Sequence, residues 1–172
     1  MSKKYKEIMK LKIAIACVLV LVALAGIFPS FRAGVFDSLS AIYAAVLVNL
    51  TNQNRATANI SKLKTNPTLE KAAQMKADDM AAKGYFSHNT PDGKTPWYWF
   101  QKAGYEYIYA GENLAVNFEN SEDVETAWMN SPGHFLNIMN PKYTEIGIAT
   151  STGIYEGREA IFVVQMFGSP AE

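Results

Sequence analysis

The chain contains two histidines, His88 and His134, and both lie among residues that favour loops and helix starts. Asn89 follows the first, and Pro132 and Gly133 precede the second. Imidazole transfers protons near neutral pH and is a common ligand of divalent transition metals. The two histidines are therefore the first candidates for a functional site, with a purely structural role as the alternative.

Two acidic residues interrupt apolar stretches of the sequence. Glu112 lies within residues 110–116, and Glu145 precedes an apolar run that includes Ile146 and Ile148. A carboxylate in such surroundings needs a partner. If both acids meet both histidines, the donor set suits a divalent transition metal, with Zn²⁺ as the first candidate. Equally, a carboxylate could orient an imidazole as a general base, although no nucleophile is evident.

The spacing of these four residues does not by itself predict that they converge. They are far apart in the sequence, and no helical or hairpin period joins them. None belongs to a known metal motif such as His-Glu-x-x-His on a helix. Asn113 and Asn137 could line the same site or satisfy turns. The positions of all six residues depend on the elements that carry them.

Those elements indicate an α+β fold, because the expected helices come first and the clear strands last. Apolar spacing and capping residues predict helices over Val35–Leu50, Pro67–Lys83 ended by Gly84, Pro96–Gly104, Ser121–Met129 and Gly133–Met139. The polar stretch Thr51–Asn66 is expected to be the end of the first helix followed by a loop, and Asn66-Pro67-Thr68 to open the next helix. Side-chain caps are expected at Thr95, Ser121 and Ser131. Strands are predicted at Tyr105–Tyr109, Tyr143–Ala149 and Ala160–Phe167, the last two forming a hairpin around Gly153–Gly157.

The N-terminus has the pattern of an export signal or a signal anchor. Five lysines and a single acid precede an uncharged apolar run, Ile13–Phe28. An Ala-x-Ala cleavage pattern for a signal peptide is present at Ala23-Leu24-Ala25, but it lies inside the apolar run. This position favours retention of the segment, with a membrane contact through residues 13–31. We therefore expect residues 1–33 to be a signal anchor or signal peptide and residues 34–172 to be an exported domain. The domain is membrane-anchored on the extracytoplasmic face, or secreted if the segment is cleaved.

The composition of residues 34–172 excludes some classes of function. The chain has 16 basic and 16 acidic residues, and residues 1–33 hold six of the former and one of the latter. The domain is therefore acidic, which argues against binding to a nucleic-acid backbone. The only cysteine in the sequence, Cys17, precedes the domain, so the domain forms no internal disulfide. Aromatic residues gather between Tyr85 and Tyr109, which fits a core seam, a sugar-stacking surface or a lipid groove.

Taken together, the motifs resemble the superfamily of cysteine-rich secretory proteins, antigen 5 and pathogenesis-related proteins, in its bacterial SCP-like (CAP) form. The resemblance covers residues 44–168 and rests on several short motifs in order: Leu47-Val48-Asn49, Asn66-Pro67, Tyr85-Phe86-Ser87-His88, Gly111-Glu112-Asn113-Leu114-Ala115, Ser131-Pro132-Gly133-His134, Tyr143-Thr144-Glu145-Ile146-Gly147 and Gln165-Met166-Phe167-Gly168. It implies an α-β-α sandwich, a small antiparallel sheet covered by helices on both faces. It also implies a central cavity lined by His88, Glu112, His134 and Glu145, with Asn113 and Asn137 nearby, able in some members to hold Zn²⁺.

The resemblance also implies a function class. We expect an extracytoplasmic module that binds a small ligand, a lipid or a cell-surface component in this cavity. A metal-dependent hydrolase of peptides or cell-wall polymers and a surface adhesion or structural domain are the alternatives. The sequence departs from eukaryotic members by lacking their disulfide cysteines and by continuing after Phe135 with Leu136-Asn137 in place of Thr-Gln. Their activities are therefore not carried over.

Overall fold

The structure is a computed structural model, and it describes residues 44–171. The predicted signal or anchor segment and the first part of the predicted helix Val35–Leu50 lie outside the described residues. Within the described range, no helix is both long and apolar enough to cross a bilayer.

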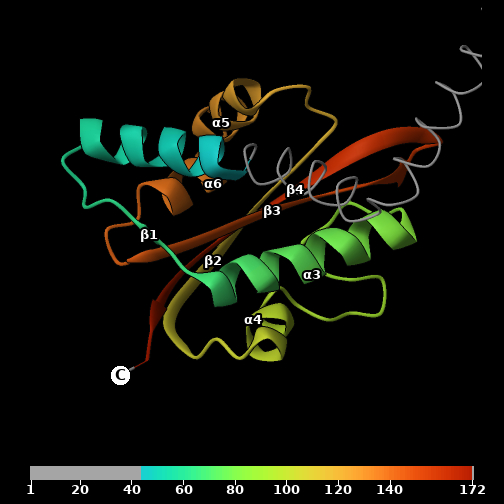
Figure 1. Cartoon of the computed structure of the whole chain (residues 1–172), viewed down its shortest axis with the longest axis horizontal. Coiled ribbons are helices and arrows are strands. Elements are labelled where there is room, and N and C mark those ends of the chain that lie inside the picture. Colours follow the sequence, from blue (N-terminus) through green and yellow to red (C-terminus); the bar gives the residue numbers. More distant parts are fainter. Residues whose placement is uncertain (1–43, 172) are drawn as a thin grey trace, which may run out of the picture. The chain divides into compact units, whose positions relative to one another are not determined.

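A four-stranded sheet in the order β1-β3-β4-β2 forms the centre of the fold (Figure 1). Its strands are β1 (Lys64–Thr65), β2 (Tyr107–Val116), β3 (Glu145–Tyr155) and β4 (Arg158–Pro170). The three long strands are antiparallel, as expected, and the two-residue β1 adds a parallel pairing to β3. β2 continues well past Tyr109, where the sequence prediction ended it, because Glu112 and Asn113 find polar partners within the fold.

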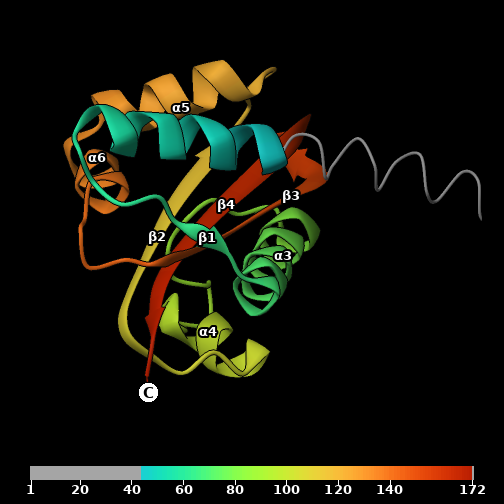
Figure 2. The same cartoon turned by 60° about the vertical axis from the view of Figure 1, so that its left-hand side comes forward.

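Helices cover both faces of the sheet, which confirms the α+β sandwich (Figure 2). α3 (Pro67–Lys83) and α4 (Trp97–Ala103) lie on one face. The helical residues 44–57, α5 (Ser121–Asn130) and α6 (Pro132–Ile138) lie on the other. Successive side chains of β4 point to opposite faces of the sheet and so contribute to a hydrophobic core on each face. Phe162, Val164 and Met166 pack towards α3, and Val163 and Phe167 pack towards α5.

The boundaries of α3 follow the predicted signals. The side chain of Asn66 accepts hydrogen bonds from the amides of Thr68 (2.8 Å) and Leu69 (3.3 Å), and Gly84 ends the helix with φ of 65°. The predicted caps Thr95, Ser121 and Ser131 were wrong. Asn120 caps α5 in place of Ser121, whereas neither α4 nor α6 has a side-chain cap hydrogen bond.

The polar stretch after Leu50 was predicted as the helix end plus a loop, and the helix continues through it to residue 57. Thr51 and Arg55 on this helix are fully buried. The Arg55 guanidinium donates to four main-chain carbonyls, those of Ser61, Ile138, Asn140 and Tyr143. Polar residues can extend a buried helix when the fold supplies their hydrogen-bond partners, and here it does.

The β3–β4 hairpin confirms the predicted turn region. Its two turn residues, Glu156 and Gly157, both have positive φ, as a two-residue type I′ turn requires. At the other end of β3, Gly147 lies directly against α3, and a Cβ atom there would overlap the carbonyl carbon of Leu69. The sheet and α3 are therefore packed backbone to backbone at this point.

Candidate functional site

His88 and Glu112 form a hydrogen-bonded pair at one edge of the sheet. His88 lies in the loop between α3 and α4, and its side chain is 53% exposed, whereas that of Glu112 on β2 is 2% exposed. Nδ1 of His88 is 2.7 Å from Oε1 of Glu112. The second carboxylate oxygen of Glu112, Oε2, is buried and has no hydrogen-bond partner among the described residues. The pair therefore joins an open imidazole to a buried acid with one unused acceptor.

Burial sets the proton affinities around this pair. It raises the pKa of Glu112, while the hydrogen bond from His88 and the charge of Lys76 act in the opposite direction. Burial also lowers the pKa of His134, and the proximity of His88 lowers it further. Both effects favour the neutral form of the His134 imidazole.

Asn113 and Asn137 hold α6, and with it His134, against β2. Asn113 donates through Nδ2 to the carbonyl of His134 at 3.2 Å. Asn137 donates to the carbonyl of Glu112 at 3.1 Å and to Oδ1 of Asn113 at 2.8 Å. Asn113 is fully buried. In this structure the two asparagines join elements, and His134 is thereby kept beside the strand that carries Glu112.

The outer edge of β2 is covered by side chains. The carbonyls of the alternate residues Ala110, Glu112 and Leu114 accept hydrogen bonds from the Tyr143 hydroxyl, the Asn137 amide and the Trp128 indole, at 3.0, 3.1 and 2.9 Å. Alternate carbonyls of a strand point to the same side. This stretch of the edge is thus not free to pair with another strand.

Glu145, predicted as the fourth site residue, does not join the other three. Its carboxylate accepts hydrogen bonds from the Tyr105 hydroxyl (2.7 Å) and the Asn66 amide (2.9 Å). Gly168 of β4 pairs with both Glu145 and Ala110. Glu112 is two residues farther along β2, so its Cα is about 12 Å from that of Glu145, given strands about 4.8 Å apart and a rise of about 3.4 Å per residue. Glu145 instead links the start of β3 to the N-cap residue of α3 and to the segment that precedes β2.

The described residues contain no group of three or more histidine, cysteine, aspartate or glutamate side chains that could hold a metal ion. The four-residue zinc set suggested by the sequence is therefore not assembled in residues 44–171. What the structure does assemble is the His88–Glu112 pair with His134 nearby.

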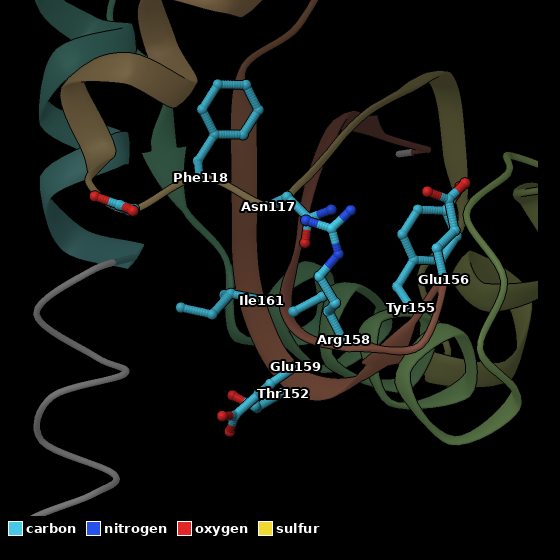
Figure 3. Close-up of a pocket in the computed structure, with 10 residues that line it drawn as sticks. Asn117, Phe118, Thr152, Tyr155, Glu156, Arg158, Glu159 and Ile161 are labelled. Atoms are coloured by element: carbon cyan, nitrogen blue, oxygen red, sulfur yellow. The ribbon is translucent and has the colours of Figure 1, made fainter.

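A depression lies elsewhere, at the turn end of the β3–β4 hairpin (Figure 3). It has a volume of about 620 Å³ and is lined by the hairpin end and the segment after β2: Asn117, Phe118, Glu119, Thr152, Tyr155, Glu156, Arg158, Glu159, Ala160 and Ile161. None of the predicted cavity residues lines it. Ile161 is five residues from Met166, the partner of Glu112, a separation of about 17 Å along β4.

The model of the cysteine-rich secretory protein family matches residues 48–167 of this chain. The chain belongs to this family. Its matched segment contains the whole sheet except the end of β4, together with His88, Glu112 and His134.

Several bacterial proteins resemble the chain. The uncharacterized protein YkwD of Bacillus subtilis (strain 168) is 41% identical over 112 residues, which cover 65% of this chain and 43% of YkwD. An extracellular SCP-domain protein of Bacillus anthracis str. Ames has a TM-score of 0.65 and 27% identity, covering 75% of this chain and 41% of its own. An outer surface protein of Borrelia burgdorferi has a TM-score of 0.64 and 28% identity, covering 74% of this chain and 92% of its own. The chain thus spans less than half of YkwD and of the Bacillus anthracis protein.

The sequence reading missed a residue of the CAP domain that contacts the His88 loop, Lys76 of α3. A lysine on a helix normally marks the solvent face, but Lys76 is fully buried. A signal was present in the spacing, because Lys76 falls within the three- and four-residue series of buried positions Leu69, Ala72, Ala73, Ala77 and Met80.

The sequence also gave no indication of a second group of residues, which supports the main chain of His134 on the sheet face covered by α5 and α6. Gln165 receives a hydrogen bond from Asn113 (2.9 Å) and donates to the Thr51 hydroxyl (2.9 Å). Thr51 donates in turn to the buried carboxylate of Glu125 at 3.0 Å, which also accepts from Asn54 at 2.8 Å. This chain of side chains runs from the helical residues 44–57 to the carbonyl of His134. No sequence spacing pointed to it, because its members come from separate elements.

The aromatic segment is mainly part of the core, as one of the sequence alternatives held. Trp99, Phe100 and Tyr105 are buried, while Trp97 and Tyr109 are about two-fifths exposed. Trp97 also lies 6.2 Å from the ring of Tyr107, which links α4 to the start of β2.

Proposed function

We propose that this CAP domain is an exported ligand-binding module whose site is centred on His88, Glu112 and His134. The observation that carries the proposal is the buried Glu112 carboxylate, which has one oxygen paired to an exposed imidazole and the other unpaired. A buried unpaired acceptor on a rigid strand is costly unless something occupies it. It therefore favours a site over a structural bridge.

Export is supported by two observations. The similar proteins include an extracellular protein and an outer surface protein. The lysine-rich N-terminus followed by Ile13–Phe28 has the pattern of a signal anchor. We propose that the segment is retained, so that the domain works at the extracytoplasmic face of the membrane that residues 13–31 enter.

The chemistry of the site limits the ligand. In the form with Glu112 ionised and the His88 ring neutral, Nδ1 of His88 donates to Glu112 and Nε2 is left as an acceptor. Oε2 of Glu112 is a second acceptor, and the neutral ring of His134 can donate or accept. The site suits a ligand that presents hydrogen-bond donors, such as the hydroxyl and amide groups of cell-surface components.

A site with four protein ligands for Zn²⁺ does not fit these residues, because Glu145 is engaged elsewhere. We propose instead an open site, in which His88 and His134 would hold the ion and Glu112 would orient His88 from behind, an arrangement common around metal-bound histidines. When bound, a divalent ion would supply Lewis-acid chemistry at the open positions. The neutral state of His134 favours this use, since a ligating imidazole must be unprotonated.

Two titrations of the full-length protein in detergent test these proposals. In the first, the imidazole signals of His88 and His134 are followed by nuclear magnetic resonance (NMR) during addition of muropeptides, glycans and envelope lipids. Shifts at both rings that disappear in Glu112→Gln support ligand binding, and no shift with any class rejects it. In the second, calorimetry with Zn²⁺ should show binding that weakens at least tenfold in His88→Ala and His134→Ala. Phe135→Ala, a partly exposed neighbour, is the control.

A hydrolase is the second candidate, and the His88–Glu112 hydrogen bond specifically favours it. A carboxylate on Nδ1 leaves Nε2 as a general base that could activate water. Turnover of peptides or cell-wall polymers that falls at least a hundredfold in both His88→Ala and Glu112→Gln would support this activity. An absence of turnover in the wild type would leave the binding module as the function.

A further inference from the structure

Lys76 occupies an unusual position for a lysine. It lies in the middle of α3, within the core cluster formed by that helix and the sheet, and none of its surface is exposed. A buried ammonium group is stable only when hydrogen bonds or opposite charges replace its water. The hydrogen-bond partners of the Lys76 ammonium group therefore indicate its role.

All three donors of the ammonium group have an acceptor. Nζ is 2.7 Å from the carbonyl oxygen of Ser87, 2.9 Å from that of His88 and 3.2 Å from the hydroxyl of Tyr85. The Tyr85 hydroxyl donates in turn to Asp79 at 2.8 Å. Two of the three acceptors are main-chain atoms of the loop that carries the exposed imidazole.

His88 is thus fixed at two points by different elements. Lys76 on α3 holds its main chain, and Glu112 on β2 holds its ring. α3 packs against the face of the sheet that includes Leu114 of β2, and its Leu69 and Met80 belong to the same core cluster as Leu114. Because both anchors are packed into this core, the direction of the ring is set by their combination.

We propose that Lys76 is a positioning residue of the site, whose ammonium group fixes the backbone of His88 so that the ring meets Glu112 before any ligand arrives. The role presupposes the ligand site proposed above, but its geometry does not depend on which ligand binds. The charge of Lys76 also favours the ionised form of Glu112, which keeps the carboxylate an acceptor for the ring.

The test is the state of the His88 ring in the ligand-free, full-length protein in detergent. Ring ¹⁵N shifts at about pH 8, above the usual imidazole pKa, report which nitrogen carries the proton. We expect mainly the Nδ1–H form in the wild type, and at least a twofold loss of that form in Lys76→Met. Lys71→Met, at an exposed position on the same helix, should keep the wild-type ring state.

A merely structural role for Lys76 would give a different result. Lys76→Met would then lower the melting temperature and leave the ring populations of His88 unchanged, and this outcome would overturn the proposal. If Lys76→Met does not fold, Lys76→Arg provides the test, because its longer, planar group displaces the two carbonyls while keeping the charge. A wild-type ring state in Lys76→Arg would also overturn it. Failure of every ligand titration would reject the proposed function without changing either ring measurement.

Discussion

Asn137 of α6 donates its side-chain amide to the main-chain carbonyl of Glu112 at 3.1 Å. This bond joins the helix that carries His134 to the strand that carries the buried acid. The relative position of the two site residues therefore depends on an amide that touches neither functional group.

Asn137→Ala should loosen α6 from β2. It removes the hydrogen bonds to Glu112 and Asn113 and leaves a buried Asn113 oxygen without its donor, so we expect a loss of about 1–3 kcal/mol in the free energy of unfolding. Urea denaturation measures this loss. Leu136→Ala, next to it and 68% exposed, should change stability by less than about 0.5 kcal/mol. Equal effects of the two substitutions would contradict the assigned role.

Glu125 should make stability depend on pH. Burial raises its pKa above the usual value of 4.5, although Asn54 and Thr51 donate hydrogen bonds to it. A raised folded-state pKa gives a contribution that is complete below the unfolded pKa and is lost as pH rises through the folded value. We therefore expect the wild type to lose stability relative to Glu125→Gln between about pH 4 and about pH 8, as measured by urea unfolding at both ends.

The exposed Glu122 on the same helix provides the control for this effect. Glu122→Gln should follow the wild-type pH dependence. A stability difference between wild type and Glu125→Gln that stays constant, or that grows in favour of the wild type towards the alkaline end, would show that Glu125 is not the group responsible.

Glu145 should behave as a structural brace and not as a site residue. Glu145→Gln weakens the charged hydrogen bonds from Tyr105 and Asn66, with an expected cost of about 1–3 kcal/mol. Tyr105→Phe should cost a similar amount, and the double variant should cost less than the sum, because the two residues share one bond. The His88 and His134 imidazole signals should not change. A shift of those signals comparable to that in Glu112→Gln would return Glu145 to the site.

Gly147→Ala tests the contact between α3 and β3. A Cβ atom there would overlap main-chain atoms of Leu69 and Glu70, so we expect a loss of about 3 kcal/mol or more or a failure to fold. In Gly133→Ala the new methyl group meets nothing within 4 Å, and helix propensity should raise stability by up to about 1 kcal/mol. Thermal unfolding distinguishes the two, and a neutral Gly147→Ala would refute the packing described.

The sequence predicted the fold well where local chemistry decides it. Asn66 and Gly84 lie at the two ends of α3, as the sequence predicted, and the hairpin turn lies in the predicted Gly153–Gly157 region. It predicted poorly where buried polar residues find distant partners. Thr51 and Arg55 extend a helix that was expected to end, and Glu112 and Asn113 extend β2, because tertiary hydrogen bonds replace the water that those side chains would otherwise need.

The site was predicted in the same way. His88 and Glu112 were recognisable as polar residues in unusual company, and the structure joins them. Glu145 looked equivalent in the sequence, but the register of β3, β4 and β2 separates it from Glu112. Lys76 was overlooked because a single lysine in a helix is ordinarily solvated, and only its place among buried positions distinguishes it.

The side chains of Tyr143, Asn137 and Trp128 along the edge of β2 also bear on how copies of the domain behave together. A membrane-anchored protein reaches high local concentration in two dimensions, where an open strand would recruit its neighbours into aggregates. In the described residues, one border of the sheet is closed by these side chains and the other ends in the two-residue β1. With the membrane anchor proposed above, neighbouring copies would then remain separate folded units even at high density.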